Sequence, residues 1–111
     1  MAGSVNKATI LGNVGNEPEH KQLPNDGQVV SFSIATSEKY KDKDGNQQEQ
    51  TEWHRCVAFG KLAGIIQQYV KKGDKLYVEG KLKTRSYDDA NGVTKYTTEI
   101  VVKEMVMIGN K

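Results

Sequence analysis

Aromatic and basic side chains recur at every second position in two segments of the chain. If residues 51–59, TEWHRCVAF, form a β-strand, one face carries Trp53, Arg55 and Phe59. The same parity in residues 75–87 gives a face with three cations and a tyrosine: Lys81, Lys83, Arg85 and Tyr87. Such a surface suits a single nucleic-acid strand, because every base has a π-face and every nucleotide has a phosphate. The pattern therefore predicts stacking without base-specific reading, since no array of bidentate base contacts is evident.

Each of these residues taken alone has a simpler interpretation. Large aromatics such as Trp53 and Phe59 are usually buried in a core. Basic residues commonly line a solvated strand face. Tyr40 and Tyr87, at the ends of expected strands, are equally compatible with edge packing. The binding interpretation therefore depends on the convergence of all these side chains on one surface.

An enzymatic alternative uses the acidic and imidazole groups of the chain. Asp88 and Asp89, together with Glu79 and His54, are residue types that a metal-dependent nuclease requires. The two aspartates precede an Asn-Gly pair, however, and are better explained by turn formation. The sequence has no HExxH motif, phosphate-binding glycine loop or paired cysteines, and Cys56 has the strand parity of a small buried thiol. We therefore expect no catalysis.

Alternating patterns predict five strands that would position the aromatic and basic residues. The expected strands are residues 5–14, 29–37, 51–59, 75–87 and 93–108. The segment 16–27 is expected to be a loop or a short edge segment, with a turn at Asn25-Asp26-Gly27, and a second turn is expected at 88–92. The polar segment 38–50 is expected to form a long, mobile hairpin tip.

The apolar period changes to that of a helix between the third and fourth expected strands. The stripe recurs with helical spacing and consists of Leu62, Ile65, Ile66, Tyr69 and Val70. Lys71 and Lys72 would lie in the last turn, where the helix dipole favours cations. Gly73 would then end the helix in a left-handed conformation.

Five strands with a helix between the third and fourth are the element order of an all-β OB-fold, a five-stranded Greek-key barrel. An SH3-like or other small barrel fits the strand count, but the helix position favours the OB-fold. The expected core faces of two strands are Val30, Phe32 and Ile34, and Leu76, Val78 and Leu82. The length of 111 residues and the lack of an internal repeat predict a single domain, residues 1–111.

The composition limits which cellular compartment and which binding partner are compatible with the chain. The net charge is only +2, but residues 1–50 carry five basic against seven acidic residues, and residues 51–111 carry eleven against seven. The basic excess therefore lies in the half that contains the proposed binding strands. The single cysteine excludes an internal disulfide, and no stretch of eighteen apolar residues occurs. We expect a soluble, cytoplasmic protein without a membrane partner.

Five segments of the chain, in this order, are similar to those of a known family: VNKATILGNVG, SFSIATSEKY, QTEWHRCVAFGKLA, YVKKGDKLYVEGKLKTRSY and YTTEIVV. With them the chain resembles the bacterial single-stranded DNA-binding proteins of replication and repair. TEWHR followed by FGKLA is a specific signature, and the segments cover nearly the whole chain. The resemblance implies an OB-fold, a homotetramer, no cofactor and no catalysis. It also implies sequence-independent binding that protects exposed DNA strands during replication, recombination and repair.

The resemblance also implies roles for individual residues. The base-stacking positions correspond to Tyr40, Trp53, Phe59 and Tyr87, and the phosphate contacts correspond to Arg55, Lys61, Lys72, Lys83 and Arg85. The positions at subunit interfaces correspond to His54 and Tyr77. A different class of function with the same fold is a primosomal or recombination accessory factor that acts mainly through protein partners.

The chain departs from the family pattern in three respects. The best-known members have tryptophan where this chain has Tyr40 and Tyr87, so less stacking area is available. Two interface glutamines of those members are replaced by Lys75 and Val106. The sequence given ends at Lys111 without the acidic-tipped tail that recruits replication and repair enzymes in the family. It is either a shortened chain or a variant that lacks this function, so the resemblance does not extend to tail-mediated partners.

Overall fold

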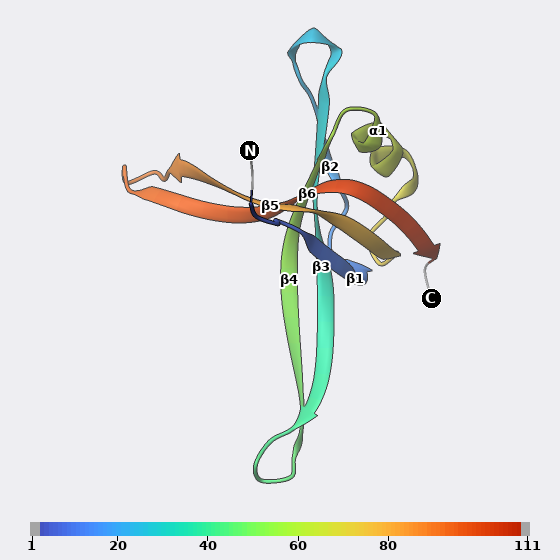
Figure 1. Cartoon of the computed structure of the whole chain (residues 1–111), viewed down its shortest axis with the longest axis vertical. Coiled ribbons are helices and arrows are strands. Elements are labelled where there is room, and N and C mark those ends of the chain that lie inside the picture. The colour runs from blue at the N-terminus through green and yellow to red at the C-terminus, as the bar shows by residue number, and fades with distance from the viewer. Residues whose placement is uncertain (1–2, 110–111) are drawn as a thin grey trace.

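The computed structural model describes residues 3–109, and within them the chain forms six strands and one α-helix (Figure 1). A short 3-10 turn, η1, occupies Pro24–Asp26. The main elements in chain order are β1 Ala8–Val14, β2 Glu19–Gln22, β3 Gln28–Lys41, β4 Gln47–Phe59, α1 Gly60–Tyr69, β5 Lys75–Asp88 and β6 Thr94–Gly109.

The strands follow the order β1-β5-β6-β4-β3-β2, and an additional pairing of β1 with β3 closes five of them into a barrel. Among the strands of the described residues, β4 and β6 are the one parallel pair, at Cys56↔Ile100 and Val57↔Val101. The helix lies between the third and fourth barrel strands, as predicted, so the OB-fold is confirmed. Within the segment 16–27, β2 adds a short edge strand to β3.

Closure of the barrel requires β1 to approach β3 closely at one end. Asn13 pairs with Lys75 of β5 on one side and with Ala35 of β3 on the other. At the preceding position, Gly12, a Cβ atom would overlap the carbonyl oxygen of Ala35. Glycine is therefore required here by space, which explains its place near the end of an otherwise β-branched and aliphatic strand.

The core lies inside the barrel and beneath the helix. Its buried members come from every barrel strand and from α1: Val14, Val30, Phe32, Ile34, Cys56, Ala58, Ala63, Ile66, Val70, Leu76, Val78, Ile100 and Val102. The prediction for Val30, Phe32 and Ile34 is confirmed, whereas Leu82 is 47% exposed. Leu82 has the predicted parity, but the pairing of β5 with β1 ends at Gly80, so Leu82 lies beyond the closed part of the barrel and is only partly covered.

The helix buries a narrower stripe than the spacing predicted. Ala63 and Ile66 of the helix and Val70 at its C-cap are buried, whereas Ile65 and Tyr69 are 41% and 55% exposed. A short helix at the edge of a barrel contacts the core along one line, so the flanks of a wide apolar stripe remain in solvent.

The expected end of the helix was also wrong. The helix ends at Tyr69, so Lys71 and Lys72 lie beyond its last turn. Gly73 does adopt a left-handed conformation, with φ of 94°, but it does so in the turn that follows the helix. The Asp74 carboxylate accepts the N–H of Lys71 in that turn and stabilises it.

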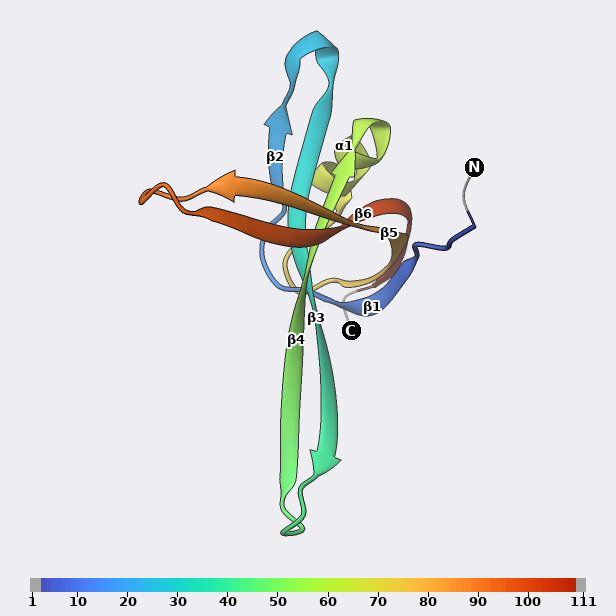
Figure 2. The same cartoon turned by 60° about the vertical axis from the view of Figure 1, so that its left-hand side comes forward.

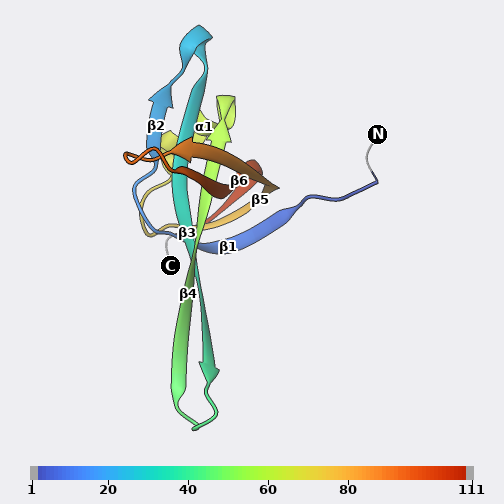
Figure 3. The same ribbon diagram turned by 90° about the vertical axis from the view of Figure 1, so that its left-hand side faces the viewer.

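Two hairpins extend from the barrel in different directions (Figures 1 and 2). The β3–β4 arm is the long hairpin that points away from the η1 turn, as Figures 1 and 3 both show. The β5–β6 arm projects to the side. The expected long tip at 38–50 is therefore wrong, because strand pairing continues to Lys41↔Gln47. Backbone hydrogen bonds support an antiparallel ladder even where both side-chain rows are polar.

Candidate nucleic-acid interface

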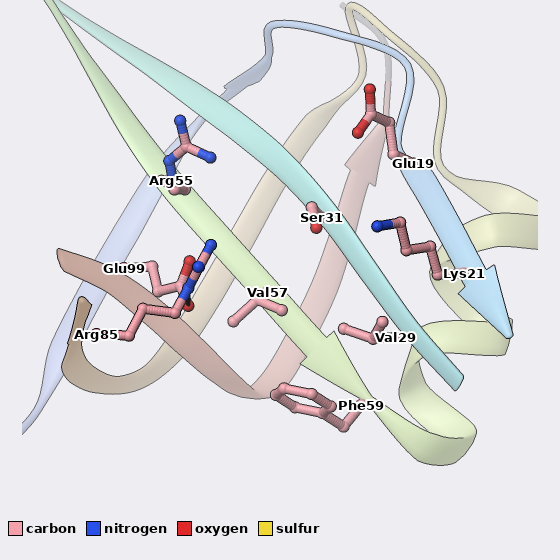
Figure 4. A pocket seen from close by; sticks show the side chains of 9 residues that line it. All are labelled: Glu19, Lys21, Val29, Ser31, Arg55, Val57, Phe59, Arg85 and Glu99. Atoms are coloured by element: carbon pink, nitrogen blue, oxygen red, sulfur yellow. Dashed lines mark hydrogen bonds and ion pairs between the residues drawn. The ribbon is translucent and has the colours of Figure 1, made fainter. Parts of the chain in front are cut away.

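A shallow groove of about 410 Å³ crosses the outer face of the barrel beside the β5–β6 arm (Figure 4). Three cations and two carboxylates share it with an exposed aromatic ring. Its lining comes from β2 to β6: Glu19, Lys21, Val29, Ser31, Arg55, Val57, Phe59, Arg85 and Glu99.

The parity of β4 presents the aromatic and basic residues to this surface. Cys56 and Ala58 are fully buried in the core, so the residues of opposite parity lie on the outer face, where Val57 is only 6% exposed. Trp53 is 63% and Phe59 54% exposed, and Arg55 is exposed between them. Burial of the two aromatics in the core, the simpler interpretation of the sequence, is therefore wrong.

The Trp53 ring rests against the loop after β1. A Cβ atom at Gly15 would overlap the six-membered part of the indole and would lie 3.2 Å from the Ser33 hydroxyl. The loop is fixed because Asn16 Oδ1 accepts hydrogen bonds from the Ser33 amide at 2.9 Å and from its hydroxyl at 2.7 Å. The sequence pattern does not single out Gly15 and Asn16, because a Gly-Asn pair after a strand indicates only a turn.

The basic face of β5 reaches the same groove. Arg85 Nε donates a hydrogen bond to Glu99 Oε1 at 3.0 Å, and the side chains lie together in Figure 4. Glu99 is 9% exposed, and Lys83 is its direct partner across the β5–β6 ladder. Glu99 was not identified from the sequence, where it is an ordinary acid in a strand. Tyr87 lies farther along the arm and lines a second hollow with Arg55 and Arg85.

Tyr40 lies on a different face. In the β3–β4 ladder Ala35 pairs with Trp53 and Tyr40 pairs with Gln48. Directly paired residues share a face, and faces alternate along a strand. Tyr40 is therefore on the side opposite Trp53, and the expectation that all four aromatics share one surface is wrong.

Three of the expected phosphate contacts lie outside the groove lining, although one of them, Lys83, pairs with Glu99 on the same face of the β5–β6 ladder. Lys61 is an exposed residue in the first turn of α1. Lys72 is exposed in the turn after the helix, and its backbone N–H donates to Glu17 Oε1 at 2.9 Å. Lys61 and Lys72 are close to the binding strands β4 and β5 in the sequence, but neither side chain lines the groove in the structure.

The two expected interface residues occupy separate places. His54, which is half-buried on β4, shares a 2.8 Å hydrogen bond between its Nε2 and the Thr36 hydroxyl. Tyr77, on β5, donates its hydroxyl to Glu79 at 3.2 Å, and this bond raises the pKa of the tyrosine. Tyr77 pairs with Leu11 on one side and with Val106 on the other.

The residues of the enzymatic alternative do not converge. Residues 3–109 contain no group of three or more His, Cys, Asp or Glu side chains placed to hold a metal ion. Asp88 accepts a hydrogen bond from the Thr94 hydroxyl, and Asp89 accepts two backbone N–H groups within its turn. Burial raises the pKa of the Cys56 thiol to about 12, which excludes an accessible thiolate at neutral pH.

The geometry defines an OB-fold protein with exposed aromatic rings and cations on one outer face. Residues 5–108 match the model of the Single-strand binding protein family, and the chain belongs to that family. Membership agrees with the expectation that the chain is not an enzyme, and does not favour the accessory-factor alternative. In the part of the chain that the structure describes, no helix is long and apolar enough to span a membrane.

Two similar proteins illustrate the match. The chain is 53% identical over 112 aligned residues to Single-stranded DNA-binding protein 1 of Chlorobaculum tepidum, covering all of this chain and 69% of that protein. A solved structure described as a Plasmodium falciparum SSB complex with ssDNA superposes with a TM-score of 0.87 and 33% identity. That similarity covers 97% of this chain and 98% of the other.

Proposed function

We propose that the protein binds single-stranded DNA without sequence preference. The observation that carries the proposal is the exposure of Trp53 and Phe59 on a strand face that also presents Arg55. Large aromatics left in solvent beside cations are suited to stacking bases and neutralising phosphates, and each stacked base contributes about 1–3 kcal/mol. The relative from Chlorobaculum tepidum carries this activity in its name.

The path of the strand follows from the placement of the cations. Arg55 and Arg85 line the groove beside Phe59, and Lys83 lies one step along the same face of β5. Tyr87 extends that face toward the tip of the arm. A strand contacts Tyr40, Lys61 or Lys72 only after it leaves the groove, so these residues form outlying contacts.

The cellular role that fits this binding mode is the protection of exposed DNA strands during replication, recombination and repair. Stacking and phosphate contacts accept any sequence, which is the requirement for coating strands wherever they are exposed. The location that fits this role is the cytoplasm, in association with the nucleoid, where exposed DNA strands occur. The role needs no cofactor, because binding alone protects the strand.

A homotetramer is proposed on the basis of two surfaces that remain open. Leu11 and Val106, each 52% exposed, flank Tyr77 on the outer face of the barrel. Apolar residues exposed side by side on a sheet are typical of an association surface. His54 lies at the base of the β3–β4 arm and marks the second contact.

Titration with oligo-dT tests the binding. Trp53 is the only tryptophan, so quenching of its fluorescence reports stacking at one known place. The affinity should fall as salt rises, because phosphate contacts release counterions. Unchanged fluorescence together with no complex at low salt would reject the function.

Light scattering with oligo-dT of increasing length tests the assembly. The expected mass is that of four chains, with one or more strands bound. A monomer at micromolar concentration would contradict the tetramer without affecting the binding proposal. Tyr77→Arg places a charge between two apolar neighbours and should lower the mass of the assembly.

A further inference from the structure

Glu99 is the one charged residue among residues 3–109 that is buried in the binding surface. Its side chain is 10% exposed, whereas that of its partner Arg85 is 54% exposed. The carboxylate lines the same groove as Arg55 and Phe59. A phosphate bound in this groove therefore meets an anion that the fold holds in place.

The contact between Glu99 and Arg85 involves the inner edge of the guanidinium. Arg85 Nε donates to Glu99 Oε1, and an arginine has four further N–H donors on its two terminal nitrogens. Lys83 lies directly opposite Glu99 on the ladder. In the free protein one carboxylate thus neutralises part of the cationic face that a strand must use.

We propose that Glu99 is an internal competitor for the DNA backbone and weakens binding through Arg85. The role rests on the proposed function. When a phosphate binds Arg85, it lies close to the Glu99 carboxylate, which opposes binding because like charges repel at short range. Glu99 lies on β6, which pairs with β5 on one side and β4 on the other, and its side chain is only 10% exposed and hydrogen-bonded to Arg85, so the fold favours its present position beside the groove.

Weakened binding has a functional consequence. A coat on single-stranded DNA must be removed when the strand is copied or re-paired, and dissociation rates account for most affinity differences between related complexes. Glu99 would therefore increase the rate at which the strand leaves the groove. Cations elsewhere on the face, such as Lys81 and Arg55, have no hydrogen-bonded acid among the described residues.

Glu99→Gln tests this role, since the amide keeps nearly the same shape but removes the charge. We expect the dissociation constant for oligo-dT to fall about three- to tenfold at 0.1 M salt, from relief of one short-range repulsion. The salt dependence should become steeper by about 0.7 in log–log slope, the value for one additional single-strand phosphate contact. Stopped-flow fluorescence of Trp53 should show most of the change in the dissociation rate.

Asp44→Asn is the matched control. It removes the same charge at the tip of the β3–β4 arm, outside the groove lining, and should leave the affinity within about twofold. If Glu99→Gln proves unstable by circular dichroism, Glu99→Asp draws the carboxylate back from Arg85 and should give a smaller tightening.

Weaker or unchanged binding by a folded Glu99 variant overturns the competitor role. Weaker binding would instead show that Glu99 orients Arg85 for the phosphate. Absence of binding by the unmodified protein would be a failure of the proposed function and is recognised before any variant is compared.

Discussion

The β3–β4 and β5–β6 arms have the same turn but different surfaces. In each turn one aspartate, Asp42 or Asp89, accepts backbone N–H groups two and four residues later through the same oxygen. A glycine with φ near 80° follows in both, Gly45 at 83° and Gly92 at 79°. Identical local chemistry therefore builds both tips, and the turns cannot account for a difference in binding.

The difference lies in how the charges fall on the strand faces. Residues 38–52 carry three basic and five acidic residues, whereas residues 81–99 carry four basic and three acidic. Tyr40 shares its face with Glu38 and Glu52. Tyr87 shares its face with Arg85 and with Lys95 directly opposite. An aromatic ring supports strand binding only where the surrounding charges also attract phosphate, so the arms should contribute unequally.

The largest effect is expected at Trp53, whose ring lies where the two arms meet and lines a hollow with Leu82 of the β5–β6 arm. Trp53→Ala should lower oligo-dT affinity by about 1–3 kcal/mol, since it removes a stacking plane. Anisotropy of a labelled oligonucleotide measures the loss. Tyr69→Ala, at an exposed aromatic of α1 outside the groove, should bind normally. Equal losses of affinity in both variants would contradict a specific stacking role for Trp53.

The arms are compared directly by Tyr87→Ala and Tyr40→Ala. Both tyrosines are about half exposed, at 47% and 49%, so the difference between them is one of surroundings. Tyr87→Ala should cost about 1 kcal/mol, or roughly fivefold in affinity, and Tyr40→Ala less than about twofold. A greater loss at Tyr40 would show that the strand crosses to the acidic face of the β3–β4 arm.

The smallest effect is expected at low pH, where the turn at the tip of the β3–β4 arm should lose stability. Hydrogen bonds from the Asn46 backbone above all, and also from Gln48 and Asp44, lower the pKa of the Asp42 carboxyl. A lowered pKa means that Asp42 stabilises the folded tip fully above its unfolded pKa, about 3.9, and that this stabilisation is lost as the pH falls through the lower folded value. Amide shifts of Asp44 and Asn46 between pH 6 and pH 2.5 should report the loss by NMR.

Asp42→Asn separates the titration from the turn. The amide keeps an acceptor oxygen but has no proton to gain in this range. The two amide shifts should then be independent of pH. Persistence of the same pH dependence in Asp42→Asn would assign it to another group.

Local pattern determined the strands, the helix position and the outward face of β4. Alternation decides which side chains share a face, because the period of a strand is two. It therefore identified Trp53, Arg55 and Phe59 as one set, and it separated them from the buried Cys56. The family signature around TEWHR was also legible in the sequence and is confirmed by the match over residues 5–108.

Only the tertiary structure decides which strand faces come together on one surface of the protein. Alternation cannot show that β5 leaves the barrel before Leu82, nor that Tyr40 faces away from Trp53, because both depend on pairing partners distant in sequence. The same holds for Glu99, an ordinary strand acid until folding buries it against Arg85. The alternation of β4 by itself determines the stacking face. The cations beside that face, the opposing Glu99 carboxylate and the exclusion of Tyr40 from the face depend on how the strands pair in the barrel and its arms.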